Sequence, residues 1–374
     1  MIVKKKICKN SFTYEEILHA YMQCRKHKRN SKSAVEFEKN FTSKLEILLK
    51  EINEDRFKSG RYKVFPVLKP RLREIWAAPF KDRIVHHLIH NELQETFEKH
   101  FIDQTYSCLK GRGTGKCIND AFRGFRKITK NFQEDAFFIK LDIKSFFVSI
   151  NKEILWNIIK ERLDENCLLA NLTKKVIFND ITKNPIYVNK NLLSKIPSHK
   201  TLFNIDYRKQ GLPIGNLTSQ FFSNIYLDAL DQYCKHVLKL KYYYRYADDI
   251  LILVKNSKTI NDIVSKINEW LKQNRNLTLN LNKTVANRVS LGIKFLGSRL
   301  YKYYKIPSKV LFNKIKISNK KFKKNIFDQN LFASINSYLG LNSLFDIYSF
   351  CSGVLNNNRL DLIYDNETTK IVYL

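Results

Sequence analysis

The fold is decided by residues 243–253, which run Tyr243-Tyr244-Arg245-Tyr246-Ala247-Asp248-Asp249-Ile250-Leu251-Ile252-Leu253. Two β-forming runs flank two adjacent acids, which predicts a β-hairpin with Asp248 and Asp249 at its tight turn. Adjacent carboxylates repel each other, so such a turn favours a compensating divalent cation or a cationic substrate. A solvated Asp-Asp turn is the alternative, and taken alone this stretch would favour it.

A second stretch favours the metal site over the solvated turn. Residues 137–147 run Phe137-Phe138-Ile139-Lys140-Leu141-Asp142-Ile143-Lys144-Ser145-Phe146-Phe147. Here a single acid, Asp142, ends a hydrophobic strand and is followed by aromatic residues. The chain therefore carries two strand ends that bear acids.

The elements between and after these stretches predict how the acids meet. We expect a helix from near Lys152, a helix over residues 221–238, the hairpin at Asp248, a helix over residues 260–274 and a strand at residues 277–281. This β-α-β-β-α-β order predicts a ferredoxin-like palm, in which Asp142 approaches Asp248 and Asp249. Residues 164–209 are too long for a simple connection and predict an insertion with its own hairpin.

Composition points to a globular protein that binds polyanions. The chain has 374 residues, 44% of them hydrophobic, which is enough for two or three cores and excludes a disordered protein. Its 66 Lys and Arg exceed its 35 Asp and Glu, and this surplus favours strong, salt-dependent binding of nucleic acid. A solvated basic surface explains part of the excess. The 19 Tyr and 26 Phe among the basic residues favour a channel in which rings stack on bases.

The seven cysteines are scattered without a Cys-x-x-Cys pair, which indicates reduced thiols rather than disulfides or a zinc ribbon. The amino terminus has no apolar core of signal-peptide length, and no stretch is long and apolar enough to span a bilayer. We therefore expect a cytoplasmic protein without a membrane partner.

Two motifs suggest other chemistry and do not fit it. The run Gly111-Arg112-Gly113-Thr114-Gly115-Lys116 lacks the spacing of a phosphate-binding Walker loop, and Cys117 stands where Ser or Thr is needed. His86 and His90 lie one helical turn apart, but on an apolar face with no third ligand nearby they are expected to be packed helix residues.

Three carboxylates around one turn suit two divalent cations about 3.5 to 4 Å apart, one activating a hydroxyl and one holding a leaving pyrophosphate. Mg²⁺ fits best because it prefers oxygen ligands and bridges substrate phosphates. Phe146 and Phe147 follow Asp142 closely enough for one ring to lie against a sugar and exclude a 2′-hydroxyl. The other ring, or both, would simply pack in the core.

Five ordered motifs resemble the successive palm motifs of reverse transcriptases. They lie at residues 138–147, 211–220, 246–249, 279–284 and 295–297. The Arg73 region and residues 106–115 resemble the fingers motifs of that family. The resemblance extends over roughly residues 35 to 350 and implies an RNA-directed DNA polymerase that uses two Mg²⁺ ions, dNTPs, an RNA template and the RNA/DNA duplex that results.

The resemblance also implies individual roles. It assigns the metal site to Asp142, Ile143, Asp248 and Asp249, with the three acids catalytic. It implies that Lys69 and Arg73 hold the triphosphate and that Phe147 is the sugar gate. The loop with Ile214, Gly215 and Gln220 would contact the template and the incoming base, and Lys283 would lie near the leaving pyrophosphate. The primer grip would be formed by Phe295, Leu296 and Gly297.

The expected fold class is α+β, a right-hand polymerase with fingers, a ferredoxin-like palm and a helical thumb. We place an N-terminal helical segment at residues 1–60, the fingers at 61–135, the palm at 136–300 with the insertion at about 164–209, and the thumb at 301–374.

One motif departs from most of the family. Where most reverse transcriptases have Gln-Gly-x-x-x-Ser-Pro, this chain has Ile214-Gly215-Asn216-Leu217-Thr218-Ser219-Gln220. This pattern resembles the enzymes of diversity-generating retroelements, which copy a template with errors at adenines together with a small basic accessory protein. Bacterial antiphage defence reverse transcriptases, which share the fold and motif order, are the rival assignment. Either would work on a dedicated, non-coding RNA.

A hypothesis of another class is a non-catalytic RNA-binding protein on a polymerase scaffold. The charge and aromatic content fit it equally well. Three converging carboxylates argue against it, because they would repel the phosphates of the bound RNA.

Overall fold

The computed structural model describes residues 6–26, 29–68, 71–323, 334, 337, 344–345, 360–365 and 368–373. The chain forms two compact units, each built from three segments. The first combines residues 1–108, 142–239 and 263–283, and the second combines residues 109–141, 240–262 and 284–374. Segments far apart in the sequence therefore share one unit.

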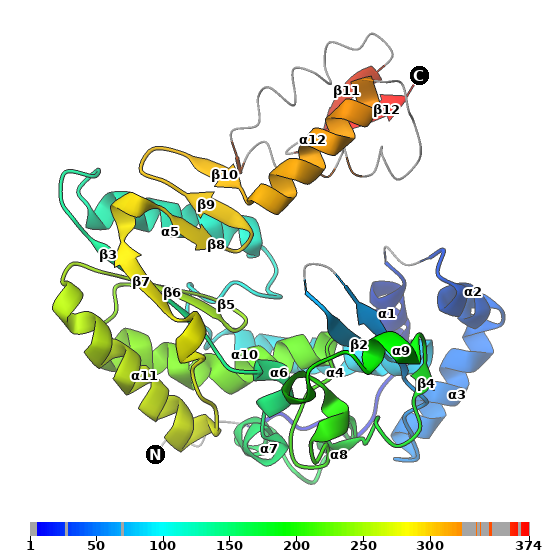
Figure 1. The fold of residues 1–374 in the computed structure, drawn as a ribbon. Coiled ribbons are helices and arrows are strands. Elements are labelled where there is room, and N and C mark those ends of the chain that lie inside the picture. The colour runs from blue at the N-terminus through cyan, green and yellow to red at the C-terminus, as the bar shows by residue number, and fades with distance from the viewer. Residues whose placement is uncertain are drawn as a thin grey trace. The chain divides into compact units, whose positions relative to one another are not determined.

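The first unit is mainly helical (Figure 1). Its helices are α1 (Tyr14–Arg25), α2 (Lys32–Glu38), α3 (Phe41–Asn53), α4 (Phe80–Glu98), α6 (Phe146–Ser149), α7 (Lys152–Lys160), α8 (Leu168–Phe178), α9 (Lys190–Leu193), α10 (Leu217–Gln232) and most of α11 (Ile260–Arg275). Its strands are β1 (Lys63–Val67), β2 (Arg73–Ala77) and β4 (Ile186–Tyr187). The helices expected from near Lys152 and over residues 260–274 are confirmed.

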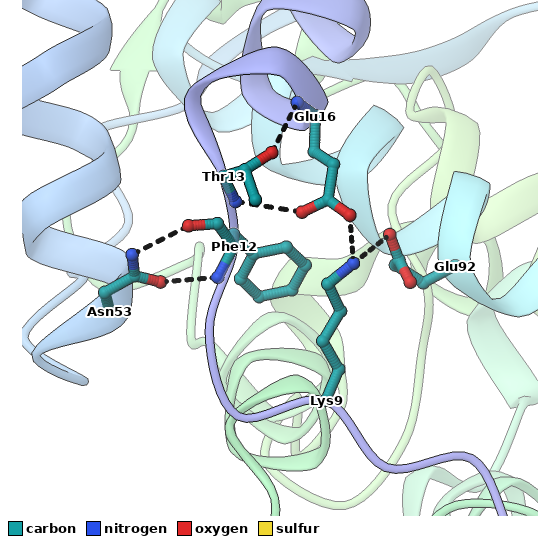
Figure 2. Close-up of polar contacts among 6 residues, drawn as sticks. All are labelled: Lys9, Phe12, Thr13, Glu16, Asn53 and Glu92. Atoms are coloured by element: carbon teal, nitrogen blue, oxygen red, sulfur yellow. Dashed lines mark hydrogen bonds and ion pairs between the residues drawn. The ribbon is translucent and has the colours of Figure 1, made fainter.

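Polar contacts tie residues 9–13 to three helices (Figure 2). Thr13 and Glu16 form a capping box at the start of α1, which satisfies backbone N–H groups that a helix terminus leaves free. Asn53 of α3 bonds the backbone of Phe12 in both directions, at 2.8 and 2.9 Å. Lys9 contacts Glu16 and donates to Glu92 of α4 at 3.0 Å, so the N-terminal segment is fixed on α1, α3 and α4.

A three-stranded sheet of order β2-β1-β4 lies in the same unit. β1 pairs antiparallel with β2, and β4 pairs parallel with β1. The expectation of a separate hairpin in the insertion is therefore wrong, because its strand extends this sheet instead. A strand of two residues is too short to show an alternating pattern, so the sequence did not reveal it.

The insertion packs into a buried core that includes Val64, Trp76 and Leu202. Beside this core lies the fully buried side chain of Lys152, whose Nζ sits 3.5 Å from the centre of the Tyr207 ring. Burial lowers the pKa of the Lys152 ammonium to about 7, against the opposing attraction of Asp180 and Asp206. Lys152 Nζ is the one deeply buried side-chain polar atom in the described structure without a hydrogen-bond partner.

The second unit contains the palm sheet. Its strands are β3 (Phe137–Asp142), β5 (Tyr242–Tyr246), β6 (Asp249–Val254) and β7 (Val285–Arg288), in the order β5-β6-β3-β7. With the connecting helices, this is the β-α-β-β-α-β order and strand arrangement of a ferredoxin-like palm. Helix α5 (Thr114–Ile128) packs on this sheet. Gly124 makes the contact possible, since a Cβ there would lie 2.0 Å from the Tyr244 hydroxyl oxygen.

The last palm strand lies later in the chain than expected. Residues 277–281 form only an isolated bridge between Leu279 and Ile143, and the fourth strand is β7. Every residue of β7 is exposed, so hydrophobic periodicity could not indicate it. The prediction of a strand at residues 277–281 is therefore wrong, although the topology is right.

The rest of the second unit comprises a small sheet, a helix and a hairpin. The sheet is formed by β8 (Ile293–Phe295), β9 (Ser298–Leu300) and β10 (Lys305–Pro307), followed by α12 (Lys309–Lys323) and the hairpin β11 (Leu360–Asp365) and β12 (Thr368–Tyr373). Residues 301–374, expected to form a helical thumb, therefore contain the β11–β12 hairpin as well as helix α12. The six cysteines among the described residues are free thiols. None of the described helices is both long and apolar enough to cross a membrane.

Candidate active site

The two adjacent acids lie at a tight hairpin turn, as expected. Tyr246 pairs with Asp249 across β5 and β6, so Ala247 and Asp248 form a two-residue turn. Ala247 has a φ of 52°, which an L residue rarely adopts. The guanidinium of Arg245, which is completely buried, donates from Nη1 to the Ala247 carbonyl at 3.2 Å. A buried cation thus holds the strained turn that presents Asp248.

The neighbouring strand supplies a cation to this turn. Lys140 on β3 places its Nζ 3.7 Å from Oδ1 of Asp249, the first residue of β6. Both side chains are partly exposed, so we count the pair as a weak contact that orients charge rather than as a source of stability. The contact between Lys140 and Asp249 shows that the start of β6 lies beside β3.

Asp142 ends β3 and is also paired with a cation. Its Oδ2 accepts from Lys283 Nζ at 2.8 Å and from Asn280 Nδ2 at 3.3 Å. The next residue, Ile143, is buried and forms a bridge with Leu279. Lys283, expected near a leaving pyrophosphate, therefore lies against a carboxylate. Since the side chain of Lys283 is 41% exposed, it is free to turn towards another anion.

The loop at residues 211–220 is attached to two parts of the first unit. The N–H of Leu212 donates to the Phe147 carbonyl at 2.7 Å, and the Ile214 carbonyl accepts from the Trp76 N–H at 2.8 Å. Gly215 has a φ of +117°, and a Cβ there would lie 2.8 Å from Ile75 Cγ2. Only glycine fits this close approach to β2 without strain.

The same strand β2 carries one of the expected triphosphate cations. Arg73 is exposed and lies on the same face of β2 as Ile75, because residues two apart in a strand point to the same side. Gly215 contacts Ile75, so the loop and Arg73 share this face of the strand. Lys69, the other expected cation, lies outside the described residues.

The two phenylalanines after Asp142 divide as expected between core and surface. Phe146 is buried, whereas Phe147 is only partly buried. Their rings meet edge to face with centroids 5.2 Å apart, so the core residue braces its exposed neighbour. Gln220, at the end of the loop sequence, is exposed, and its Oε1 accepts from Cys108 Sγ at 2.8 Å.

His86 and His90 are packed helix residues, as predicted. The imidazole of His86 is buried, with Nδ1 2.6 Å from the Thr218 hydroxyl and Nε2 3.1 Å from the Tyr62 hydroxyl. Burial lowers the pKa of His86 to about 3, so the ring is neutral at physiological pH. His90 packs edge-on against the Phe221 ring of α10.

The expected primer grip is a β-turn in the second unit. Phe295 is buried at the end of β8, and Leu296 and Gly297 form the turn to β9 with φ values of 46° and 76°. The Gly297 carbonyl accepts from the N–H of Ser308 at 2.8 Å, which ties the turn to the start of α12. A hollow of about 220 Å³ beside the turn is lined by four cations, Lys140, Lys294, Arg299 and Lys309.

A family model described as reverse transcriptase (RNA-dependent DNA polymerase) matches residues 67–300. The match covers more than half of the chain and includes every motif from Arg73 to Gly297. The chain belongs to the reverse transcriptase family.

Two curated relatives resemble this reverse transcriptase. Protein YkfC of Escherichia coli K12 is 22% identical over 291 residues, which cover 67% of this chain and 70% of that protein. The putative COX1/OXI3 intron 2 protein of Saccharomyces cerevisiae is 25% identical over 224 residues. This match covers 45% of the present chain and 24% of the yeast protein, so the chain spans about a quarter of that relative.

Among solved structures, this reverse transcriptase is similar to yeast telomerases. Telomerase of Candida albicans in complex with a fragment of telomeric RNA matches with a TM-score of 0.44 and 13% identity, over 86% of this chain and 64% of that one. Apo telomerase of Candida tropicalis matches with a TM-score of 0.44 and 16% identity, over 79% and 56%.

The structure adds residues to the site that the motifs did not single out. Arg245 holds the two-acid turn, Lys140 contacts Asp249, and Trp76 holds the loop, yet each stands inside a strand whose pattern indicates only a core. Arg245 offered one signal, since a charged residue at a buried strand position requires a specific partner. Within the described part of the chain, no group of three His, Cys, Asp or Glu side chains gathers closely enough to hold a metal ion.

Proposed function

We propose that this reverse transcriptase is an RNA-directed DNA polymerase in which Asp142, Asp248 and Asp249 act together on two divalent cations. The observation that carries the proposal is the strand order β5-β6-β3-β7. The turn between β5 and β6 bears two of the acids, the neighbouring strand β3 ends at the third, and Lys140 of β3 reaches Asp249.

The chemical type of these donors suits Mg²⁺. Carboxylate oxygens, supplemented by the Ile143 carbonyl, are the ligands that Mg²⁺ prefers. Two of the three acids already pair with a cation of the protein, Lys283 at Asp142 and Lys140 at Asp249. When bound, the ions would lower the pKa of the primer hydroxyl and stabilise the pyrophosphate that leaves.

The other site residues would position the substrates. Arg73, with Lys69, would hold the triphosphate of the incoming dNTP. Phe147, braced by Phe146, would lie against the sugar and exclude a 2′-hydroxyl. Lys283, once released from Asp142, would follow the negative charge to the pyrophosphate.

The second unit offers a surface for the RNA/DNA duplex. Helix α12 contains six lysines in 15 residues and no acid. Between these lysines it exposes Val310, Phe312 and Ile317, each more than 40% accessible. Cations that alternate with apolar side chains suit a duplex, whose phosphates flank a shallow groove. The hollow beside Leu296 and Gly297 would hold the primer backbone through its four cations.

We further propose that the enzyme copies a dedicated RNA with low fidelity, as in diversity-generating retroelements. The loop has Ile214 where most relatives have a hydrogen-bonding Gln, and loss of a polar contact near the new base pair lowers discrimination. A small basic accessory protein would be its partner. Sequencing cDNA made on co-purified RNA tests this, since errors should gather at template adenines, whereas faithful or repetitive product would favour antiphage defence.

Primer extension on poly(rA)/oligo(dT) with Mg²⁺ tests the polymerase itself. The wild type should extend the primer, and Asp248→Asn should not, while both bind the template equally. An inactive wild type that still binds RNA would instead favour a non-catalytic RNA-binding protein.

A further inference from the structure

The insertion is firmly attached to the sheet of order β2-β1-β4. The N–H of Ile186 donates to the Tyr62 carbonyl at 2.8 Å, and the N–H of Val188 donates to the Val64 carbonyl at 2.9 Å. The buried carboxylate of Glu74 accepts from the Thr201 hydroxyl at 2.6 Å and from the Leu202 N–H at 2.7 Å. Residues 183–209 therefore form a fixed platform on β1 and β2 rather than a loose connection.

This platform is strongly basic. Residues 183–209 contain six Lys and Arg and one acid, a net charge of +5 over 27 residues. This is more than twice the charge density of the whole chain, which carries +31 over 374 residues. The one acid, Asp206, is already paired with Arg208 and Lys209. The four remaining basic residues of the segment are all exposed, namely Lys183, Lys190, Lys195 and Lys200.

An exposed aromatic ring lies beside one of these lysines. Tyr187 is 44% exposed. Its ring stacks on Phe203, with centroids 5.7 Å apart and an angle of 19° between the planes, and Phe203 in turn packs on Trp76. Lys190 Nζ lies 5.3 Å from the centre of the Tyr187 ring. Because packing already orders the ring, little conformational entropy is lost when another ring binds to it.

We propose that Tyr187, Lys183, Lys190, Lys195 and Lys200 form a binding face for single-stranded RNA. An ordered, exposed ring offers a stacking platform for a base, and the exposed lysines of the same segment match a phosphate backbone. A duplex hides its base faces, so a single strand is the form that uses both features. The inference rests on the proposed function, since RNA is the molecule that such an enzyme copies, and it places an RNA contact on residues outside the polymerase motifs.

Fluorescence anisotropy with an unstructured single-stranded RNA, titrated with salt, tests the face. Changing its four lysines to Ser should lower affinity about tenfold or more and reduce the salt slope by about 3, since each single-strand phosphate contact contributes roughly 0.7. Tyr187→Ala should lower affinity about fivefold or more, whereas Tyr187→Phe should not, because Phe keeps the stacking surface. The charge-matched control changes the exposed Lys32, Lys39, Lys50 and Lys58 to Ser and should have little effect.

Three results would overturn the proposal. They are an equal loss of affinity in the charge-matched control, an equal loss for duplex RNA, and no loss in the face variants. Turnover at saturating poly(rA)/oligo(dT) separates this inference from the proposed function. Face variants that bind like the wild type and still polymerise would contradict only the inference. An inactive wild type whose RNA affinity depends on the face would contradict only the polymerase.

Discussion

Replacing Gly215 by Ala should disable catalysis more than it destabilises the fold. The φ of +117° at Gly215 is strained for any residue with a Cβ, and such strain costs about 1–3 kcal/mol. The added methyl would also lie 2.8 Å from Ile75 Cγ2 and 3.3 Å from the Trp76 carbonyl oxygen. The Ile75 side chain can move aside, but the Trp76 backbone belongs to β2 and cannot.

The loop would therefore leave its native position. A total cost of about 2 kcal/mol corresponds to a shift of roughly 30-fold between the native and displaced loop. Because Ile214 is hydrogen-bonded to β2 and Gly215 lies against Ile75 of the same strand, displacement should move the loop, proposed to contact the base, away from Arg73, proposed to hold the triphosphate. We expect kcat/KM for dTTP on poly(rA)/oligo(dT) to fall about tenfold or more, since each 1.4 kcal/mol is a factor of ten.

Gly292→Ala is the matched control. Its φ is +78°, and a Cβ there would lie 2.8 Å from the Tyr301 ring and 3.1 Å from the Leu300 carbonyl oxygen, so strain and crowding are similar. Both variants should lose similar unfolding free energy in denaturant titrations, but only Gly215→Ala should lose catalytic efficiency. Equal kinetic losses in the two variants, or full activity in Gly215→Ala, would refute the reasoning.

Three further outcomes follow from buried or braced side chains. The pKa of Lys152 is about 7 in the folded protein, against an ordinary value of 10.5. Between these two pH values the unfolded chain binds more protons than the folded one. The free energy of unfolding should therefore rise with pH in this range, by up to about 1.4 kcal/mol per pH unit. Lys152→Met should be more stable than the wild type near pH 7 and should lack this pH dependence. Denaturant titrations at several pH values measure both, and parallel pH profiles for the two proteins would contradict the prediction. Arg245→Met removes the guanidinium that donates to the Ala247 carbonyl and should cost about 1–3 kcal/mol of unfolding free energy. It should also weaken Mg²⁺ activation in primer extension. Unchanged Mg²⁺ dependence would show that Arg245 does not position the turn. Phe147→Ala should increase incorporation of ribonucleotides relative to deoxynucleotides in primer extension, and an unchanged ratio would argue against the sugar gate.

The sequence predicted the elements whose residues face a core. The hairpin at Asp248 and Asp249, helix α11 and the palm order all follow from apolar periodicity, and the structure confirms them. The division of Phe146 and Phe147 between core and surface also followed, because at least one of two large aromatic rings beside a buried strand is expected to pack in the core.

Other features carried no such signal. The edge strand β7 is exposed on both faces, and β4 is two residues long, so neither shows a hydrophobic pattern. Lys140, Lys283 and Asn280 meet carboxylates only because the tertiary fold brings distant segments together. Pairings of that kind depend on long-range contacts, which local patterns do not specify.

The central claim is that Asp142 and the turn at Asp248 and Asp249 serve one metal site. Iron-directed cleavage tests it without relying on activity, because Fe²⁺ bound in place of Mg²⁺ reduces added hydrogen peroxide to hydroxyl radicals that cut the backbone nearby, and ascorbate regenerates the Fe²⁺. We predict cuts near residues 142–143 and near residues 247–249 in the same reaction, suppressed by excess Mg²⁺ and lost from both places in Asp248→Asn. Cleavage at only one of the two segments, or cuts at residue 142 that persist in Asp248→Asn, would contradict the account.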